Sequence, residues 1–219
     1  MENISENPYD PKAIYRSIFG EKMRGRFQKW PDIHFDVLKE VNPDVVGWIH
    51  LDQSPISYPV VTERPGSYYL RHNFSREESI HGAVSMDIRN GGAVGEYVTS
   101  LAAHNMKDWS MFAGIIKLDD EEYRAKRPYI DFLTEEKRYR AKVFAGCFTQ
   151  HYEPSINKVI FRDRDQFESW LNLVMERDEM HTGIIPDRNA RLLACHTCAF
   201  DGKPNHDEYM VLGILEEVS

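Results

Sequence analysis

Residues Arg191–Cys198, RLLACHTC, hold two of the three cysteines of this 219-residue chain. The stretch is short and mostly apolar, and turn-forming residues bound it on both sides, PDRN at 186–189 and DGKP at 201–204. This pattern predicts a buried β-strand that ends at a loop. A thiol at the end of such a strand can be presented to a substrate as a nucleophile. The sequence therefore raises the question of which cysteine, Cys195 or Cys198, has that role.

Similar short apolar stretches, separated by turn signals, continue through most of the chain and predict a mainly β fold. The expected strands are residues 45–51, 56–61, 84–87, 98–103, 129–133, 139–150, 191–198 and 209–215. Many short strands at close spacing favour a closed or nearly closed barrel over alternating strands and helices.

Two helices are predicted before the barrel and one within it. Asp10 and Pro11 form a helix start, and apolar residues recur at helical spacing up to Phe27. A second helix, which ends at Asn42, has one apolar face: Ile33, Val37, Leu38 and Val41. The third, residues 165–179 with Asp165 as its cap, packs an apolar stripe on the barrel between the sixth and seventh strands. We expect a helical extension, residues 1–44, and a barrel domain, residues 45–219, that form one structural unit.

Composition excludes several classes of protein. The formal net charge of -8 and the lack of a basic stripe argue against nucleic acid as a partner. No apolar run approaches the length of a transmembrane helix, and the polar N-terminus does not look like a signal peptide. Three cysteines are too few for a disulfide framework, and an odd number leaves at least one free thiol.

A cysteine nucleophile needs a histidine to share its proton and a donor to stabilise the oxyanion that forms at the attacked carbonyl. The chain has nine histidines, so one histidine alone proves little. His104 stands out because it follows the apolar run 98–103 and precedes Asn105, where strand gives way to loop. That position could hold an imidazole over a cleft.

Several motifs occur together in one order between about residue 40 and the C-terminus. They are NPDVVGWI at 42–49, YPVV at 58–61, YYL at 68–70 followed by NF at 73–74, MDIRN at 86–90, and HNMKD at 104–108 with SMF at 110–112. In these motifs the sequence resembles class B sortases, the cysteine transpeptidases of Gram-positive cell envelopes. The segment that begins at His104 is the most specific, because in that family it carries the catalytic histidine.

The resemblance implies a sortase-like closed barrel of eight strands, with two N-terminal helices and one helix between strands six and seven. It also places the nucleophile at Cys198, preceded by Thr197 as in the family. Cys195 falls where the family has leucine, which suits a small buried side chain. Strand alternation agrees, because residues three apart point to opposite faces. Cys147, in an apolar run, is expected in the core.

The mechanism that the resemblance implies is transpeptidation. Cys198 would attack a carbonyl in the C-terminal sorting motif of a surface or pilin protein and form a thioester. His104 would act as general acid for the leaving amine and then as base for the incoming amine, from peptidoglycan or a pilin lysine. Asn105 is expected either to orient His104 or to form a turn. No metal or organic cofactor is expected.

The expected location is the cell envelope, at the outer face of the plasma membrane. Sortases are usually held there by an N-terminal hydrophobic helix, which this sequence does not contain. Either the chain is cut from a longer protein, or the protein is naturally unanchored.

The chain departs from the family at Glu208, the position that the resemblance assigns to an arginine that holds the substrate carbonyl or stabilises the oxyanion. A carboxylate near Cys198 disfavours a thiolate, and losing one oxyanion donor costs about 100- to 1000-fold in rate. Three explanations are open. In the first, a nearby cation, Lys203 or His206, takes the role of the arginine. In the second, backbone N–H groups after Thr197 stabilise the oxyanion alone, with Glu208 turned away or binding an amine substrate. In the third, catalysis is slow or absent. His196, on the same strand face as Cys198, is either a further candidate or an ordinary half-buried histidine.

Two alternatives to an active sortase follow. One is a protein with the sortase fold that binds sorting peptides and turns over poorly. The other is a thiol redox protein that uses Cys195 and Cys198 as a C-x-x-C pair. Redox pairs of this kind usually lie at a helix N-terminus, whereas this pair ends a strand. A zinc site would need a second pair of ligands at suitable spacing, and the sequence has none.

Overall fold

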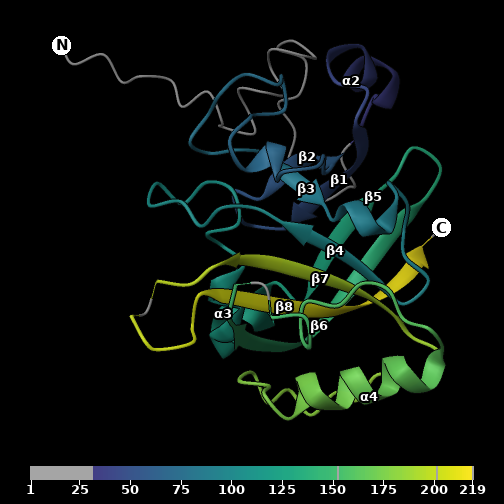
Figure 1. Cartoon of the computed structure of the whole chain (residues 1–219), viewed down its shortest axis with the longest axis vertical. Coiled ribbons are helices and arrows are strands. Elements are labelled where there is room, and N and C mark those ends of the chain that lie inside the picture. Colours follow the sequence, from purple (N-terminus) through teal and green to yellow (C-terminus); the bar gives the residue numbers. More distant parts are fainter. Residues whose placement is uncertain (1–31, 152, 201, 219) are drawn as a thin grey trace.

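The computed structural model describes residues 32–151, 153–200 and 202–218. Its strands form a closed barrel in the order β1-β2-β3-β4-β7-β8-β6-β5 (Figure 1). Their bounds are β1 (Val45–Leu51), β2 (Ser57–Thr62), β3 (Val84–Met86), β4 (Val98–Ala102), β5 (Tyr129–Leu133), β6 (Arg138–Thr149), β7 (Arg191–Cys198) and β8 (Glu208–Val218). The predicted closed barrel of eight strands is confirmed, and each strand lies where the sequence placed it, to within a few residues.

Most neighbouring strands in the barrel are antiparallel, and two pairs are parallel. The parallel pairs are β2 with β3 and β4 with β7, and β1 closes the barrel by pairing with β5. Because β4 and β7 are parallel neighbours, residues that follow them in the chain emerge at the same end of the barrel. Figure 1 shows β4 and β7 side by side, both ending at the left of the molecule.

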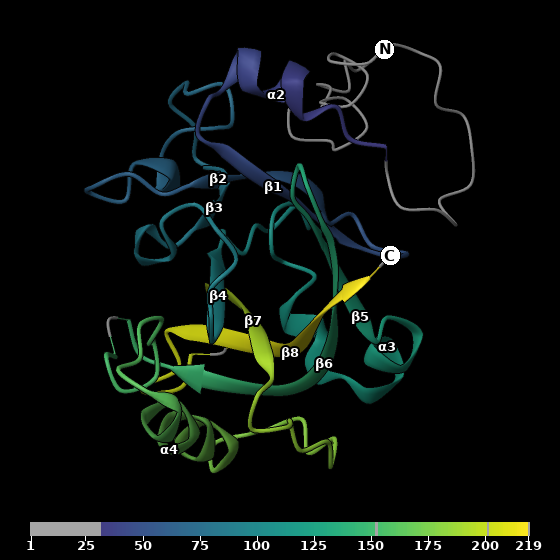
Figure 2. The same ribbon diagram turned by 90° about the vertical axis from the view of Figure 1, so that its right-hand side faces the viewer.

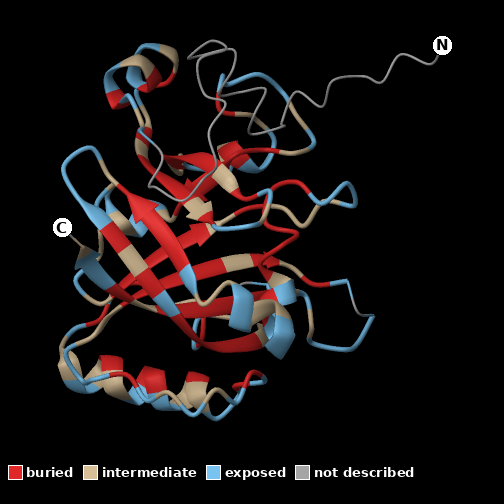
Figure 3. Ribbon diagram, turned by 180° about the vertical axis from the view of Figure 1, so that it is seen from behind, coloured by how far each residue is buried: buried red, intermediate tan, exposed pale blue. Residues whose placement is uncertain are grey.

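Alternation along the strands divides the apolar residues between two clusters. On β7, Leu193 and Cys195 lie in the barrel interior with residues such as Val60, Leu101 and Val211. Leu192 and Ala194 point outward and pack under helix α4 (Arg164–Met175). Figure 3 shows the buried positions running along the strands and along the side of α4 that faces the barrel. The alternation expected from the sequence therefore holds, and it determines which β7 side chains can reach the outside.

Helix α4 lies between β6 and β7 in the chain, as predicted, and buries Phe167, Trp170, Leu171 and Val174. Its predicted cap, Asp165, is wrong. The cap lies two residues earlier, at Asp163, whose carboxylate accepts a hydrogen bond from the Gln166 amide at 2.9 Å and so satisfies an otherwise unpaired N–H group of the first turn. The helix ends at Met175, short of the predicted 179.

The other predicted helices have different outcomes. The second N-terminal helix is α2 (Phe35–Val41), which packs Leu38 into a cluster with Trp48 and Val61. Figures 1 and 2 show α2 and α4 at opposite ends of the long axis. The first predicted helix, from Asp10, lies outside the described residues, and the boundary at residue 44 stays a prediction. The helix α3 (Glu121–Lys126) was not predicted, because six residues with no apolar stripe give little periodic signal.

Short 3-10 helices complete the described part: η1 (Tyr68–Leu70), η2 (Ile88–Asn90) and η3 (Ile116–Asp119). Among the residues that the structure describes, no helix combines the length and apolar character needed to cross a membrane.

Candidate active site

The register of β4 against β7 places His104 beside Cys198. Val98 pairs with Leu192 and Ala102 with His196, a constant difference of 94 residues along the parallel ladder. The same difference, continued two residues past the end of β4, sets His104 level with Cys198. Adjacent strands lie about 5 Å apart, so the two residues predicted to be catalytic leave the same end of neighbouring strands.

Hydrogen bonds extend this ladder beyond the end of β4. The Thr197 hydroxyl donates to the Ala103 carbonyl at 3.0 Å, and Thr197 is buried. The Asn105 side-chain amide donates to the Cys198 carbonyl at 2.9 Å. Asn105 therefore contacts the backbone of Cys198, and Thr197 links β7 to the residue after β4 on the interior side of the barrel. Both side chains fix the position of the Cys198 backbone relative to the loop that carries His104.

The imidazole of His104 is oriented from a third segment of chain. Its Nε2 atom lies 2.8 Å from the Leu70 carbonyl at the end of η1. A carbonyl only accepts, so Nε2 carries the proton, and Nδ1 is the ring's proton acceptor in the neutral form. The His104 carbonyl accepts from the Phe112 amide at 2.9 Å, which closes the loop after β4. The ring is thus held in one tautomer and can take or return a proton at Nδ1.

The three cysteines, all free, differ in environment. Cys195 and Cys147 are fully buried, and burial raises the pKa of both thiols, that of Cys147 to about 12. Cys198 is partly exposed; burial and the Glu208 carboxylate raise its pKa as well. Of the three thiols, only that of Cys198 is open to a substrate.

The redox alternative conflicts with the geometry of β7. Residues three apart in a strand have Cα atoms about 10 Å apart, whereas a disulfide needs them within about 7 Å. Cys195 lies in the barrel interior, and Cys198 is on the opposite face. A Cys195–Cys198 bridge would require β7 to unravel, so the geometry argues against this pair as a dithiol.

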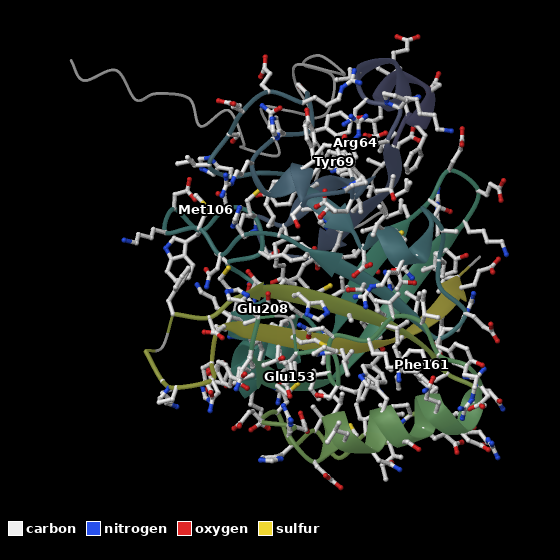
Figure 4. All side chains as sticks on the ribbon, in the orientation of Figure 1. Arg64, Tyr69, Met106, Glu153, Phe161 and Glu208 are labelled. Carbon is white, nitrogen blue, oxygen red and sulfur yellow. The ribbon has the colours of Figure 1, made fainter. Side chains whose placement is uncertain are left out.

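Glu208 begins β8 directly opposite Cys198 in the antiparallel ladder between β7 and β8. Directly opposed residues point to the same face of a sheet, with Cβ atoms about 5 Å apart. The carboxylate therefore lies next to the thiol, on the side away from His104. Figure 4 shows Glu208 and Met106, which follows His104 on its loop, on the side of the molecule where β4 and β7 end.

The partners of the Glu208 carboxylate come from the chain after β6. His151 Nδ1 lies 2.8 Å from Oε1, and the Asn157 side-chain amide lies 3.4 Å from Oε2. Sequence reasoning missed His151, although it stands at a strand end as His104 does. The pairing of β6 with β8, which brings His151 to Glu208, could not be read from the sequence.

The remaining candidates lie around this arrangement. Lys203 is exposed on the loop between β7 and β8, and the His206 ring stacks on Phe148 with centroids 4.0 Å apart. Burial lowers the pKa of His196, while the Glu208 and Asp87 carboxylates oppose that effect. Within the described ranges, no group of three or more His, Cys, Asp or Glu side chains is placed to hold a metal ion.

The arrangement is suited to acyl transfer. It combines a partly exposed thiol, an oriented imidazole on the next strand, and a carboxylate–imidazole pair on the other side. A thiol and a neutral imidazole can exchange a proton, and a thiolate attacks carbonyl carbons.

The chain is similar to two curated bacterial proteins, and no family model matches it. It is 27% identical over 165 residues to sortase B of Listeria monocytogenes, a match that covers 74% of this chain and 65% of that protein. It is 25% identical over 185 residues to sortase B of Staphylococcus aureus, a match that covers 81% of this chain and 75% of that protein. The match thus spans slightly less than two thirds of the Listeria relative.

Solved structures share the fold. A Bacillus anthracis protein described as similar to sortase B superposes with a TM-score of 0.76 at 26% identity, over 84% of this chain and 83% of that one. A Staphylococcus aureus sortase B–substrate complex superposes with a TM-score of 0.75 at 24% identity, over 84% of this chain and 85% of that one. Sequence and fold together confirm the resemblance that the motifs indicated: the chain is similar to class B sortases in both.

Proposed function

We propose that this protein is a sortase-type cysteine transpeptidase. Its substrate is the C-terminal sorting motif of a surface or pilin protein, and its acceptor is an amine of peptidoglycan or of a pilin lysine. The observation that carries the proposal is the parallel ladder between β4 and β7. This ladder brings His104 level with Cys198, whereas the other two cysteines are buried.

In the proposed reaction, Cys198 attacks the carbonyl carbon of the scissile amide. The S–C bond forms and the C–N bond breaks. His104 accepts the thiol proton at Nδ1 and passes it to the leaving amine. The incoming amine then attacks the thioester, gives its proton back to His104, and releases the thiol. The contacts of Asn105 and Thr197 support this assignment, because they fix the distance between the two catalytic segments.

The substrate and acceptor classes rest on relatives. One solved sortase B structure holds a substrate, and a second structure holds triglycine, a peptide with a free amine. The cell envelope, at the outer face of the plasma membrane, is the location that these substrates imply.

A second candidate is the same fold with weak or no catalysis. The position of Glu208 favours it, because burial raises the Cys198 pKa and the carboxylate opposite the thiol raises it further. This candidate predicts binding of sorting peptides without measurable thioester.

The test uses quenched fluorescent peptides that carry sorting motifs of class B sortases, incubated with and without triglycine. Cleavage is followed by fluorescence, and the thioester by intact-protein mass spectrometry. We expect the wild type to gain the mass of the acyl group and to lose it when triglycine is added. Cys198→Ala should abolish both signals.

Cys195→Ala is the matched control, because it removes a thiol from the same strand but from the interior face. It should keep most of the activity. If Cys195→Ala, still folded by circular dichroism, is as inactive as Cys198→Ala, the assignment of the nucleophile is wrong. Peptide binding without thioester in the wild type would favour the second candidate.

A further inference from the structure

Tyr69, the central residue of η1, is fixed at three points and immediately precedes Leu70 in the chain. Its backbone amide donates to the Glu63 carboxylate at 3.0 Å, and its carbonyl accepts from the Ala83 amide at 2.9 Å. The side chain is fully buried, and its hydroxyl donates to the Asp44 carboxylate at 2.5 Å. Because both backbone groups and the side chain of Tyr69 are held, the carbonyl of the next residue, Leu70, has little freedom to move.

Glu63 links η1 to the wall of the barrel. Its Oε1 atom accepts from the Arg64 amide at 2.8 Å and from the Tyr69 amide at 3.0 Å. Its Oε2 atom accepts from the hydroxyl of Ser85, a buried residue of β3, at 3.0 Å. Glu63 follows the last residue of β2, and its amide donates to the Met86 carbonyl at 2.8 Å, which extends the pairing of β2 with β3. One carboxylate therefore holds both β3 and the first part of η1.

A glycine lets η1 approach the segment that leads into β3. Gly82 has a φ of 62°, in the left-handed region that favours glycine. A Cβ atom at this position would lie 2.4 Å from the Tyr69 carbonyl oxygen and 3.0 Å from the Leu70 carbonyl oxygen. Any larger residue would therefore displace the backbone of η1. The second of these oxygens is the one that lies 2.8 Å from Nε2 of His104.

We propose that Glu63 and Gly82 are positioning residues for His104, and this inference rests on the transpeptidase function proposed above. Glu63 holds η1 from the β2 side, and Gly82 leaves room for it on the β3 side. Together they keep the Leu70 carbonyl in place as the acceptor for Nε2–H of His104. With Nε2 protonated and held, Nδ1 is the nitrogen that exchanges the proton with Cys198.

The polar side chains that follow His104 in the sequence have other partners. The Asn105 side-chain amide donates to the Cys198 carbonyl at 2.9 Å. The Asp108 carboxylate accepts from the Ser110 amide at 3.0 Å and from the Ser110 hydroxyl at 2.6 Å. These contacts shape the loop after β4. The orientation of the ring depends instead on η1, which comes from a distant part of the chain.

The first test removes the carboxylate. Glu63→Ala takes away the acceptor for the Tyr69 amide, whereas Glu63→Gln keeps one carbonyl oxygen for it. The rate of thioester formation is measured over a range of concentrations of the fluorescent sorting peptide. We expect Glu63→Ala to lower the maximal rate about tenfold with little change in the half-saturating concentration, because a misplaced catalytic group costs rate more than binding. Glu63→Gln should recover most of that loss.

The second test uses a matched pair of glycines. Gly91 has a φ of 63°, nearly the same as that of Gly82, and a Cβ atom there would have nothing within 4 Å. Alanine thus brings the same backbone strain at both positions but displaces η1 only at Gly82. Gly82→Ala should lower the maximal rate about 10- to 100-fold, and Gly91→Ala should stay within about threefold of the wild type. Equal losses in two folded variants would refute the role of Gly82.

The tautomer of His104 is a readout that a general loss of stability does not move. Long-range ¹H–¹⁵N NMR spectra of protein labelled at histidine distinguish the two neutral forms of the ring, and His104→Ala identifies the signals of this residue. At a pH where the ring is neutral, the wild type and Gly91→Ala should show the Nε2–H form. Glu63→Ala should show a mixture of both forms. Unchanged His104 signals in a Glu63→Ala variant with a reduced rate would overturn the proposal.

A double-mutant comparison separates this proposal from the one on which it rests. In the His104→Ala background, Glu63→Ala should change the residual rate less than about twofold, because the group that Glu63 positions is gone. A loss as large as in the wild-type background would mean that Glu63 supports the site by another route, and would refute its role while the transpeptidase stands. If the wild type forms no thioester with any peptide, the transpeptidase function fails, and the NMR comparison still decides whether Glu63 orients His104.

Discussion

The two neighbours of β7 give Cys198 opposite surroundings. On the β4 side, Asn105 donates to the Cys198 carbonyl, and His104 is held by the Leu70 carbonyl. On the β8 side, the Glu208 carboxylate faces the thiol and is held by His151. Both sides are positioned by regular strand ladders, yet only the β4 side carries the residues that the sortase resemblance predicts. The two sides of Cys198 thus share one backbone frame and differ in the charge that they present to the thiol.

The repulsion between the Glu208 carboxylate and a Cys198 thiolate can be estimated. Two unit charges about 5 Å apart at an effective dielectric constant of 20 repel by about 3 kcal/mol, which is enough to suppress a thiolate roughly 100-fold. On the side of Glu208 that faces away from Cys198, the carboxylate accepts a hydrogen bond from His151.

The largest expected effect tests the β4 side. His104→Ala removes the group proposed to move the proton, and general acid–base groups contribute about 100- to 10,000-fold. We expect kcat for peptide cleavage to fall by that range without loss of the fold. His34→Ala, a histidine at the start of α2, is the control and should be unaffected. Equal activity in the two variants would remove His104 from the mechanism.

The next effect tests the β8 side. Glu208→Arg replaces the carboxylate opposite Cys198 by the guanidinium that the family resemblance implies. It should raise thioester formation by about three- to tenfold, because a thiolate and an oxyanion both gain from a positive neighbour. The rate is measured by stopped-flow mixing with the fluorescent peptide. Unchanged or lower activity would mean that the protein has rebuilt its oxyanion site on other residues.

The same contrast explains what the sequence could predict. Alternation and turn signals located all eight strands, and the interior position of Cys195 follows from its spacing to Cys198. The motif around His104 is local in sequence, so one stretch carried the prediction. His151 and Glu208 meet only through the pairing of β6 with β8, a contact between residues 57 positions apart. Local patterns contain no information on such a contact, so the sequence suggests only Lys203 and His206 as neighbours of Glu208.

A smaller effect is expected for two side-chain amides, Asn105 on the β4 side of Cys198 and Asn157 on the β8 side. Asn105→Ala removes a 2.9 Å hydrogen bond to the Cys198 carbonyl and should lower the free energy of unfolding by about 1 kcal/mol. Asn157→Ala removes the longer, 3.4 Å contact to Glu208 and should cost less. Urea denaturation followed by tryptophan fluorescence measures both. A greater loss in Asn157→Ala would reverse the expected ranking of the two sides.

The finest test concerns the Cys198 thiol alone. Burial raises its pKa first, and the Glu208 carboxylate raises it further. The thiolate is the charged form and is repelled by the carboxylate, so Glu208→Gln should lower the thiol pKa and leave the contribution of burial. The rate of alkylation by iodoacetamide, followed against pH by mass spectrometry, reports the thiolate fraction. In the variant, the rise in rate should occur at lower pH than in the wild type. Cys195 and Cys147 are buried and should stay unmodified, so the profile belongs to Cys198. A profile that moves to higher pH would mean that the Glu208 carboxylate does not raise the pKa of the thiol.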